Sequence, residues 1–310
     1  MEESRNTKER RCAIVGIVGR TNAGKSTLVN ALVGDKVSIV SPVAQTTRSV
    51  VRGVFTDPRG QLVLVDTPGL HKSESPLGTL MNRMARQASA NVQILVVVVD
   101  ASRPPQLEDE GWFRRALFAG QPVFFLLNKC DRGPTPHVPA FHAAWKAIQD
   151  EKGHHRDDVV WMEISAATRR NLPQLLEALF ARAEPGEPYF PDDTVTDYPR
   201  PLAIADVIRE KLFRHLSQEL PHEIGVRIDD IREDGRRWHV RATILVNRPS
   251  QKPIVLGERG RVIRSVRRAA EPEISAMFDV DADLELWVKV EKNWAKNFWL
   301  LRQMGYDAPR

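Results

Sequence analysis

Apolar residues occur in short continuous runs over the first half of the chain, and segments with helical spacing separate these runs. Runs rich in valine and isoleucine are typical of strands that are buried on both faces of a parallel sheet. The runs are Cys12–Val18, Leu62–Val65, Ile94–Val99, Val123–Leu127 and Val159–Ile164, and the helical segments include Ser26–Val33 and Leu172–Ala183. This alternation predicts an α/β domain over residues 12–183, with a mostly parallel sheet and helices on both faces.

A different pattern follows a proline-rich stretch. Residues 184–201 contain five prolines and many acids, which predicts a linker without regular structure. Beyond it we expect a helix over Leu202–Leu220, strands near Glu223–Ile231 and Arg237–Val246 joined by a turn at Glu233-Asp234-Gly235, further helices that include Glu271–Phe278, and a strand over Ala282–Val290. This order predicts an α+β domain over residues 202–310, and residues 1–11 are expected to form a polar tail.

The sequence GRTNAGKS lies between the first predicted strand and the first predicted helix. It fits the pattern G-x-x-x-x-G-K-[S/T], and this position is the context that a phosphate-binding loop requires. The loop comprises Gly19, Arg20, Thr21, Asn22, Ala23, Gly24, Lys25 and Ser26, with Thr27 directly after it. Backbone N–H groups can turn toward phosphate oxygens, Lys25 can reach the β- and γ-phosphates, and the Ser26 hydroxyl can bind Mg²⁺.

Two further short sequences predict the metal shell of such a site. DTPG (Asp66, Thr67, Pro68, Gly69) ends the second predicted strand, where Asp66 suits the Mg²⁺ shell and the Gly69 N–H can bind a γ-phosphate. QTTR, at residues 45–48, stands between the phosphate-binding loop and DTPG. One of its threonine hydroxyls can complete the Mg²⁺ shell before hydrolysis and release it afterwards. The sequence does not decide between Thr46 and Thr47.

The sequence NKCD indicates which base is bound. Asp131 can accept hydrogen bonds from guanine N1–H and from the 2-amino group, and adenine lacks donors in that arrangement. A buried carboxylate without donors is costly, so a site of this kind rejects the wrong base by about 10⁴. Asn128 is expected to brace the base and the phosphate-binding loop, and the Lys129 stem to cover the ring. After the last strand of the first domain, a backbone N–H of Ser165, Ala166 or Ala167 is placed for the guanine oxygen.

These five sequences, in this order, resemble the motifs of the translation-factor-related GTPases. The resemblance implies GTP and GDP as ligands, Mg²⁺ as the metal, and Lys25, both threonines of QTTR, Asp66 and Gly69 as catalytic residues. Leu70 follows DTPG, at the place where Ras-like proteins carry the glutamine that orients the attacking water. Leucine cannot hydrogen-bond to water, so Leu70 does not position the attacking water, and the resemblance implies slow intrinsic hydrolysis. Potassium-activated relatives carry an asparagine at the place of Asn22, and we hypothesise that K⁺ bridges the phosphates there.

A second glycine motif, GERG, lies in the second predicted domain. The order helix, strand, strand, helix, G-x-x-G, helix, strand resembles that of a type II KH domain, whose loop clamps about four nucleotides of a single strand. Seven basic residues and one acid occupy residues 248–268, whereas residues 271–285 carry six acids and no base. The residues expected to contact RNA are Lys252, Gly257, Glu258, Arg259, Gly260, Arg261, Arg264, Arg267, Arg268 and Trp294. Trp294 and Trp299 can stack on bases or, equally, cap the core.

The combination of DTPGL, QTTR and a C-terminal KH module resembles the Era family of bacterial ribosome-assembly GTPases over residues 12–306. Thr21 and Ala23 depart from this family, in which proline and valine are usual. The resemblance implies binding to the 3′ end of the small-subunit (16S) ribosomal RNA and a role in maturation of the 30S subunit. Three alternatives remain: a scaffold that binds GTP without hydrolysing it, a relative that acts in RNA modification, and a membrane-associated regulatory GTPase.

Composition changes this picture little. The net charge of +5 and the pI of about 9.3 fit an anionic partner. Two distant cysteines indicate a reducing compartment, the N-terminal residues lack the apolar core of a signal peptide, and Ile94–Val99 is too short to span a bilayer. We expect a cytoplasmic protein, with any association at the inner face of the cell membrane being peripheral and electrostatic.

Overall fold

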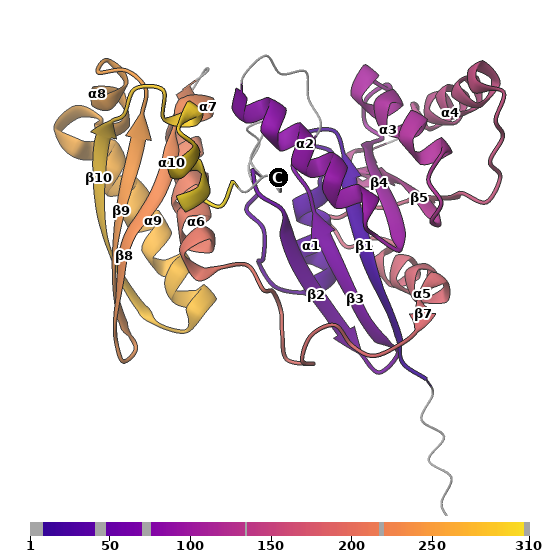
Figure 1. The fold of residues 1–310 in the computed structure, drawn as a ribbon, viewed down its shortest axis with the longest axis horizontal. Helices are drawn as coiled ribbons and strands as arrows, with labels where there is room; N and C mark the ends of the chain where they lie inside the picture. The colour runs from indigo at the N-terminus through magenta and orange to yellow at the C-terminus, as the bar shows by residue number, and fades with distance from the viewer. Residues whose placement is uncertain (1–8, 41–47, 70–75, 134, 217–219, 307–310) are drawn as a thin grey trace, which may run out of the picture. The chain divides into compact units, whose positions relative to one another are not determined.

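The computed structural model describes residues 9–40, 48–69, 76–133, 135–216 and 220–306 (Figure 1). The chain divides into two compact units. The first comprises Met1–Ser38, Val50–Ser73 and Met81–Asp197, and the second comprises Ile39–Ser49, Glu74–Leu80 and Tyr198–Arg310. The last division falls inside the proline-rich stretch, while the bounds of the predicted linker stay a prediction. The expectation that this stretch lacks regular structure is wrong at its ends, because Glu184–Pro185 form a short strand and the helix Arg200–His215 begins within it. A segment from the first half of the chain, Ile39–Ser49, thus groups with the second unit.

The first unit is built on one twisted sheet. Its strands are β1 (Arg11–Gly19), β2 (Val51–Asp57), β3 (Gly60–Asp66), β4 (Ile94–Asp100), β5 (Val123–Asn128), β6 (Val160–Glu163) and β7 (Glu184–Pro185). The strand order is β2-β3-β1-β4-β5-β6, with β7 beside β1. All five predicted strands are present. The sequence missed β2, which runs antiparallel to β3, because its residues VRGVFTD form no continuous apolar run.

Helices cover both faces of this sheet. They are α1 (Lys25–Val33), α2 (Pro76–Ala90), α3 (Leu107–Leu117), α4 (Val138–Lys152) and α5 (Leu172–Arg182), with a 3₁₀ turn η1 (Cys130–Arg132). Val97 and Val99 of β4 pack with Trp112 and Phe113 of α3, while the alternate residue Val98 is also fully buried. Because alternate side chains of a strand point to opposite faces, both faces of β4 are covered. Figure 1 shows α1 and α2 on opposite sides of the sheet.

Parallel pairing brings the predicted nucleotide-binding sequences to one edge of the sheet. Asp66, at the end of β3, is level with Ile17 of β1, and Asn128, at the end of β5, is level with Asp100 of β4. Ligands of open α/β sheets bind at this carboxyl edge. The topology therefore brings the predicted nucleotide-binding sequences together at the carboxyl edge of the sheet.

The second unit has a three-stranded sheet that helices cover. Its elements are α6 (Arg200–His215), α7 (Leu220–Glu223), β8 (Gly225–Asp234), β9 (Arg237–Val246), α8 (Gln251–Leu256), η2 (Glu258–Gly260), α9 (Arg261–Phe278), β10 (Asp281–Val290), η3 (Trp294–Lys296) and α10 (Phe298–Gln303). The sheet order is β10-β9-β8. Strands β8 and β9 are antiparallel, and β9 and β10 are parallel. This is the predicted order of a type II KH domain.

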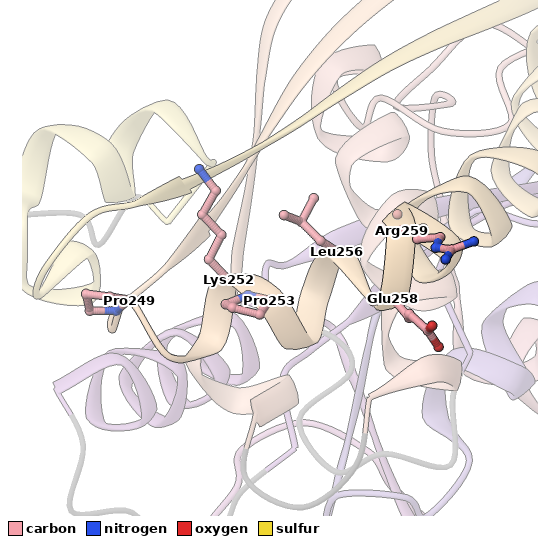
Figure 2. A pocket seen from close by; sticks show the side chains of 8 residues that line it. Pro249, Lys252, Pro253, Leu256, Glu258 and Arg259 are labelled. Atoms are coloured by element: carbon pink, nitrogen blue, oxygen red, sulfur yellow. The ribbon is translucent and has the colours of Figure 1, made fainter.

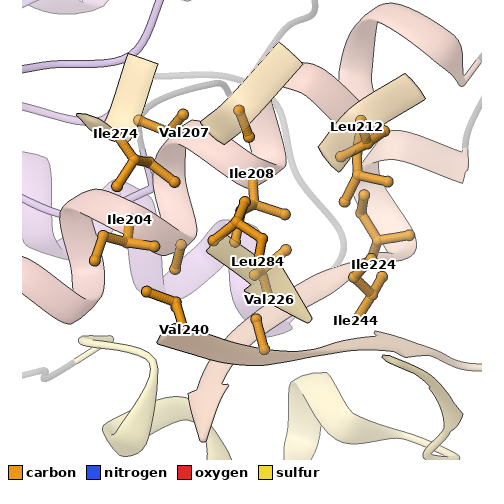
Figure 3. Packing of buried hydrophobic residues seen from close by; sticks show 14 of the residues in the cluster. Ile204, Val207, Ile208, Leu212, Ile224, Val226, Val240, Ile244, Ile274 and Leu284 are labelled. Carbon is orange, nitrogen blue, oxygen red and sulfur yellow. The ribbon is translucent and has the colours of Figure 1, made fainter. Parts of the chain in front are cut away.

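The core of the second unit lies between this sheet and the helices α6 and α9. Figure 3 shows Val207 and Ile208 of α6 close to Ile274 of α9 and to Leu284 of β10, and all four belong to one buried cluster. The spacing of the apolar residues in α6 is that of one helix face. The sheet side of the core uses alternate residues of β9, such as Val240. On the other face of β9, Arg237, His239 and Arg241 are exposed, whereas Thr243 and Leu245 are buried.

Two sequence expectations about the second unit are wrong. The helix expected over Leu202–Leu220 ends at His215, because Leu216 has an extended backbone that buries its side chain. The turn expected at Glu233-Asp234-Gly235 lies at Gly235-Arg236, where the positive φ of 57° suits glycine. Within the described ranges, no helix is both long and apolar enough to cross a membrane.

Candidate nucleotide site and nucleic-acid interface

The phosphate-binding loop follows β1 and opens α1, and the side-chain amide of Asn128 braces it. Asn128 Nδ2 donates to the Ala23 carbonyl at 2.8 Å, and Asn128 Oδ1 accepts from the Ala166 N–H at 3.0 Å. Gly24 has a φ of 100°, and a Cβ there would lie 2.3 Å from Asn128 Nδ2. One amide thus joins three predicted sequences, and glycine is required for the close approach.

Lys25 is buried at the start of α1. Its Nζ donates to the Arg20 carbonyl at 3.0 Å, which closes the loop over the helix end. Burial lowers the pKa of Lys25 to about 8, and the carboxylates of Asp66 and Asp109 oppose this change. Phosphate oxygens placed against this amine would raise its pKa again, because an anionic neighbour favours the protonated form.

Asp66 has the properties expected of a metal ligand. Its side chain is fully buried, and neither carboxylate oxygen has a hydrogen-bond partner of standard geometry among the described residues. Burial raises the pKa of Asp66, whereas Lys25 and the nearby Ser26 and Ser38 hydroxyls lower it. Two buried, unsatisfied oxygens beside a serine hydroxyl fit a hard divalent cation that prefers oxygen ligands.

The structure describes only some of the other residues that the sequence places around the metal and the γ-phosphate. Thr67 is fully buried, and its hydroxyl donates to the Ile17 carbonyl at 2.9 Å, so it fixes the end of β3 against β1. Gly69, the last residue of DTPG, is also buried. The predictions for Thr46, Thr47 and Leu70 concern residues outside the described ranges.

The predicted base-binding residues lie around the end of β5. Asp131 is exposed, and its Oδ1 accepts from the Ser165 hydroxyl at 2.5 Å. Lys129 has a φ of 71°, and its Nζ donates to the Asn22 carbonyl at 2.7 Å. The same amine pairs with Asp100 at 2.7 Å. The Lys129 stem is thereby stretched from the base side toward the phosphate-binding loop, as a ring cover requires.

Two acidic residues of this site are absent from the sequence prediction. Burial disfavours ionised Asp100, but hydrogen bonds from Lys129 and Ser102 outweigh it and lower the pKa of Asp100. Asp109, in the first turn of α3, has its pKa raised to about 6 by burial and lies 3.8 Å from Arg20 Nε. Asp109 belongs to no motif near the loop, so only the tertiary structure reveals it.

The GERG sequence forms a tight loop between α8 and α9. Gly257, Arg259 and Gly260 have φ values of 70°, 48° and 75°, which places three of four residues in left-handed conformations. A groove of about 730 Å³ lies against this loop. Its lining residues are Pro249, Lys252, Pro253, Leu256, Gly257, Glu258, Arg259 and Gly260. Apolar and basic groups therefore line the same groove, as single-stranded nucleic acid requires.

The side chains of this groove differ in direction. Figure 2 shows Lys252 and Leu256 directed to one side of the segment and the Glu258 carboxylate directed to the other. The basic residues of α9 lie outside the groove lining but all are exposed: Arg261, Arg264, Arg267 and Arg268. At 100° per residue these four cover a sector of about 120° of the helix surface. A phosphate backbone that leaves the groove would meet this sector.

Trp294 does not contribute to the exposed surface. Its side chain is fully buried, and its Nε1–H donates to the Glu223 carbonyl at 2.9 Å. The expectation that Trp294 stacks on a base is therefore wrong, because no face of the indole is accessible. Trp299 differs, since 69% of its surface is exposed and its ring contacts that of Phe298.

Family comparison agrees with both sites. Residues 14–129 match a family model described as a 50S ribosome-binding GTPase, and residues 219–295 match a KH domain model. The fold and the two sites define a P-loop GTPase that carries a type II KH domain. GTPase Era of Synechocystis is 37% identical over 96% of this chain and 92% of that protein. GTPase Era of Pseudomonas aeruginosa is 39% identical over 96% of this chain and 95% of that protein. The chain belongs to the Era family of GTPases.

Solved structures of relatives extend this likeness to the whole chain. Era in complex with MgGDPNP and nucleotides 1506–1542 of 16S ribosomal RNA has a TM-score of 0.87 and 32% identity, over 96% of this chain and all of that chain. A single-residue variant of Aquifex aeolicus Era bound to GDP·AlF₄⁻ has a TM-score of 0.86 and 31% identity with the same coverage.

Proposed function

We propose that this protein binds and hydrolyses GTP, binds single-stranded 16S ribosomal RNA near its 3′ end, and assists maturation of the 30S subunit. The observation that carries this proposal is the presence of two glycine-based sites in one chain. One is the loop that Asn128 braces, and the other is the groove at Gly257 and Gly260. A solved relative binds MgGDPNP and 16S ribosomal RNA nucleotides together, which supports both assignments.

In the nucleotide site, each residue type suits one part of GTP. The N–H groups from Gly19 to Thr27 surround the phosphates, and Lys25 neutralises them. Ser26, Asp66 and a threonine of QTTR would hold Mg²⁺, which would supply positive charge to the phosphoryl oxygens. Asp131, with Ser165 fixing one of its oxygens, accepts the two guanine donors. The Ala167 N–H is the proposed donor to the guanine oxygen, because the Ala166 N–H donates to Asn128 Oδ1, and the backbone of Thr67, Pro68 and Gly69 is proposed to contact the γ-phosphate.

In the RNA site, the groove takes bases and the surrounding charges take phosphates. Leu256 and the two prolines of the lining offer apolar surface, while Lys252 and Arg259 offer charge. The close approach of the sugar–phosphate backbone falls at Gly257 and Gly260, and the exposed arginines of α9 extend the contact. Glu258 points away from Lys252, so its carboxylate is directed away from that edge of the groove.

Two assays test the function directly. The protein should release more than one phosphate per molecule from GTP, with a Lys25→Ala preparation as the measure of contaminating activity. It should also bind a 16S 3′-end RNA at least tenfold more tightly than an RNA of equal length and reversed sequence. A single turnover at most would support the non-hydrolysing scaffold instead, and equal RNA affinities would contradict the RNA assignment.

The hypothesis of potassium activation at Asn22 has a separate test. Leu70 cannot position water, so a monovalent cation near the phosphates would supply charge that other GTPases take from an arginine. Replacement of Na⁺ by K⁺ at constant ionic strength is expected to raise kcat about tenfold in the wild type, because an added cation stabilises the charge of the transition state. The Asn22→Ala variant should lose this increase. Equal rates in the two salts would refute the hypothesis.

The cytoplasm is the proposed location, because the 30S subunit is assembled there. Peripheral membrane association stays a prediction that no observation on the described residues supports.

A further inference from the structure

Ser38, which follows α1, is a buried polar residue that the nucleotide site described so far leaves unexplained. Only 2% of its surface is exposed, and it ends the first segment of the first unit, Met1–Ser38. Its hydroxyl oxygen has no hydrogen-bond partner of standard geometry among the described residues. A buried hydroxyl in this condition costs free energy, so stability alone favours alanine at this place.

The side chain of Asn30 holds Ser38 in position. Asn30 Nδ2 donates to the Ser38 carbonyl at 2.7 Å, and Asn30 Oδ1 accepts from the N–H groups of Val37 and Ser38 at 3.0 and 2.9 Å. The Asn30 carbonyl also accepts from the Gly34 N–H at 2.9 Å, where α1 ends. One residue thus closes the helix and fixes the chain that returns to it. These side-chain bonds are called the Asn30 clamp below.

Apolar contacts fix the same segment independently of the clamp. Val37 is buried, and it packs against the place where α1 approaches Gly53 of β2. A Cβ at Gly53 would lie 2.8, 3.0 and 3.2 Å from methyl carbons of Val33, Val29 and Val37. The position of Val37 between α1 and β2 leaves little freedom to Ser38, its neighbour in the chain.

The clamp places the Ser38 hydroxyl beside Asp66, at the end of β3. Burial raises the pKa of Asp66, whereas the Lys25 charge and the hydroxyls of Ser26 and Ser38 lower it. Two serine hydroxyls therefore approach one carboxylate. Ser26 and Asn30 stand four residues apart on α1, so they lie on the same face of the helix. That face provides Ser26 directly and Ser38 through Asn30.

A donor beside a metal-binding carboxylate controls the direction of its oxygens. The terminal torsion of aspartate is broad, so a hydroxyl on one side narrows the orientations that Asp66 can adopt. Groups that hydrogen-bond to metal ligands act in this way, and their loss typically lowers metal affinity about 10- to 100-fold. This role gives a reason for serine at a buried place where stability favours alanine.

We propose that Ser38, held by the Asn30 clamp, is a positioning residue that orients the Asp66 carboxylate for Mg²⁺. This inference rests on the proposed function, and both residues lie outside all five nucleotide-binding sequences. Ser38 would contact the carboxylate and leave the metal to the ligands already named. The affinity for Mg²⁺ should therefore depend on Ser38, whereas nucleotide affinity without the metal should not.

The test measures binding of a fluorescent, non-hydrolysable GTP analogue to the full chain, at increasing Mg²⁺ concentrations and in EDTA. Ser38→Ala removes only the hydroxyl, and it should raise the Mg²⁺ concentration of half-maximal effect by about tenfold or more. Its nucleotide Kd in EDTA should equal that of the wild type. Asn30→Ala removes the clamp and keeps the hydroxyl, and it should raise the Mg²⁺ requirement in the same direction.

The measurement in EDTA distinguishes positioning from damage, since a general defect of the site would weaken nucleotide binding with and without Mg²⁺. Ser89→Ala is the matched control, because the Ser89 hydroxyl donates to the Arg86 carbonyl at the end of α2, and its Mg²⁺ requirement should equal that of the wild type. An unchanged Mg²⁺ requirement in Ser38→Ala or in Asn30→Ala overturns the proposal, and Ser38→Ala alone decides where Asn30→Ala does not fold. An equal loss of affinity in EDTA also overturns it. Failure of the wild type to bind the GTP analogue at any Mg²⁺ concentration would instead contradict the proposed function.

Discussion

Replacement of Asp131 by asparagine is expected to lower GTP affinity by about 10³- to 10⁴-fold and to raise affinity for xanthosine triphosphate. The asparagine amide presents a donor to the guanine 2-amino group, so two donors face each other and a hydrogen bond is lost. Xanthine carries an oxygen at that place and accepts from the new amide. Competition against a fluorescent nucleotide measures both affinities.

The structure makes this substitution a sharp test, because the Ser165 hydroxyl already holds one Asp131 oxygen. The exchange therefore changes donor pattern with little change in side-chain shape. Asp157→Asn, in an exposed loop, is the matched control and should leave both affinities unchanged. Similar losses for GTP and xanthosine triphosphate in Asp131→Asn would show that the residue does not read the base.

Replacement of Gly260 by aspartate is expected to weaken binding of the 16S 3′-end RNA by about 100-fold, with GTP turnover unchanged. A carboxylate at this place would face the phosphate backbone, and such like-charge contacts cost several kcal/mol. Gly260 is the better position because a Cβ there meets only the side chains of Arg264, at 3.2 Å, and Ile263, at 3.8 Å. At Gly257 a Cβ would lie 2.8 Å from the Val262 nitrogen, so any substitution would distort the loop itself.

Two further variants separate charge from shape. Gly260→Asn has nearly the same shape as the aspartate and also tolerates a positive φ, so it should weaken binding by only a few fold. Gly235→Asp adds the same charge in a turn with open space around it and should leave RNA affinity unchanged. If Gly260→Asp and Gly260→Asn lose affinity equally, backbone strain explains the loss and the phosphate contact at Gly260 is refuted.

The sequence was sufficient for features that depend on residue type at fixed spacing. Strands buried on both faces read as continuous apolar runs, and the nucleotide-binding sequences follow their ends. The sequence did not predict the edge strand β2, because its apolar residues form no continuous run. It did not predict the role of Asp109 for another reason. Asp109 contacts Arg20 only through the packing of α3, and no local pattern encodes that contact.

Trp294 shows a second limit of sequence reasoning. An aromatic residue among lysines and asparagines has the composition of a nucleic-acid contact, yet the same residues suit a chain end that closes a core. The decision depends on whether a carbonyl such as that of Glu223 is available to the indole N–H, and this is a property of the fold. Only the tertiary structure could decide it.

The brace at Asn128 has a consequence for the timing of nucleotide exchange. Its amide holds Ala23 on one side and Ala166 on the other through hydrogen bonds within the protein. These two bonds do not involve the nucleotide, so matched and mismatched nucleotides should meet the same base side of the pocket and enter at similar rates. Selection among them then depends on how long each one stays.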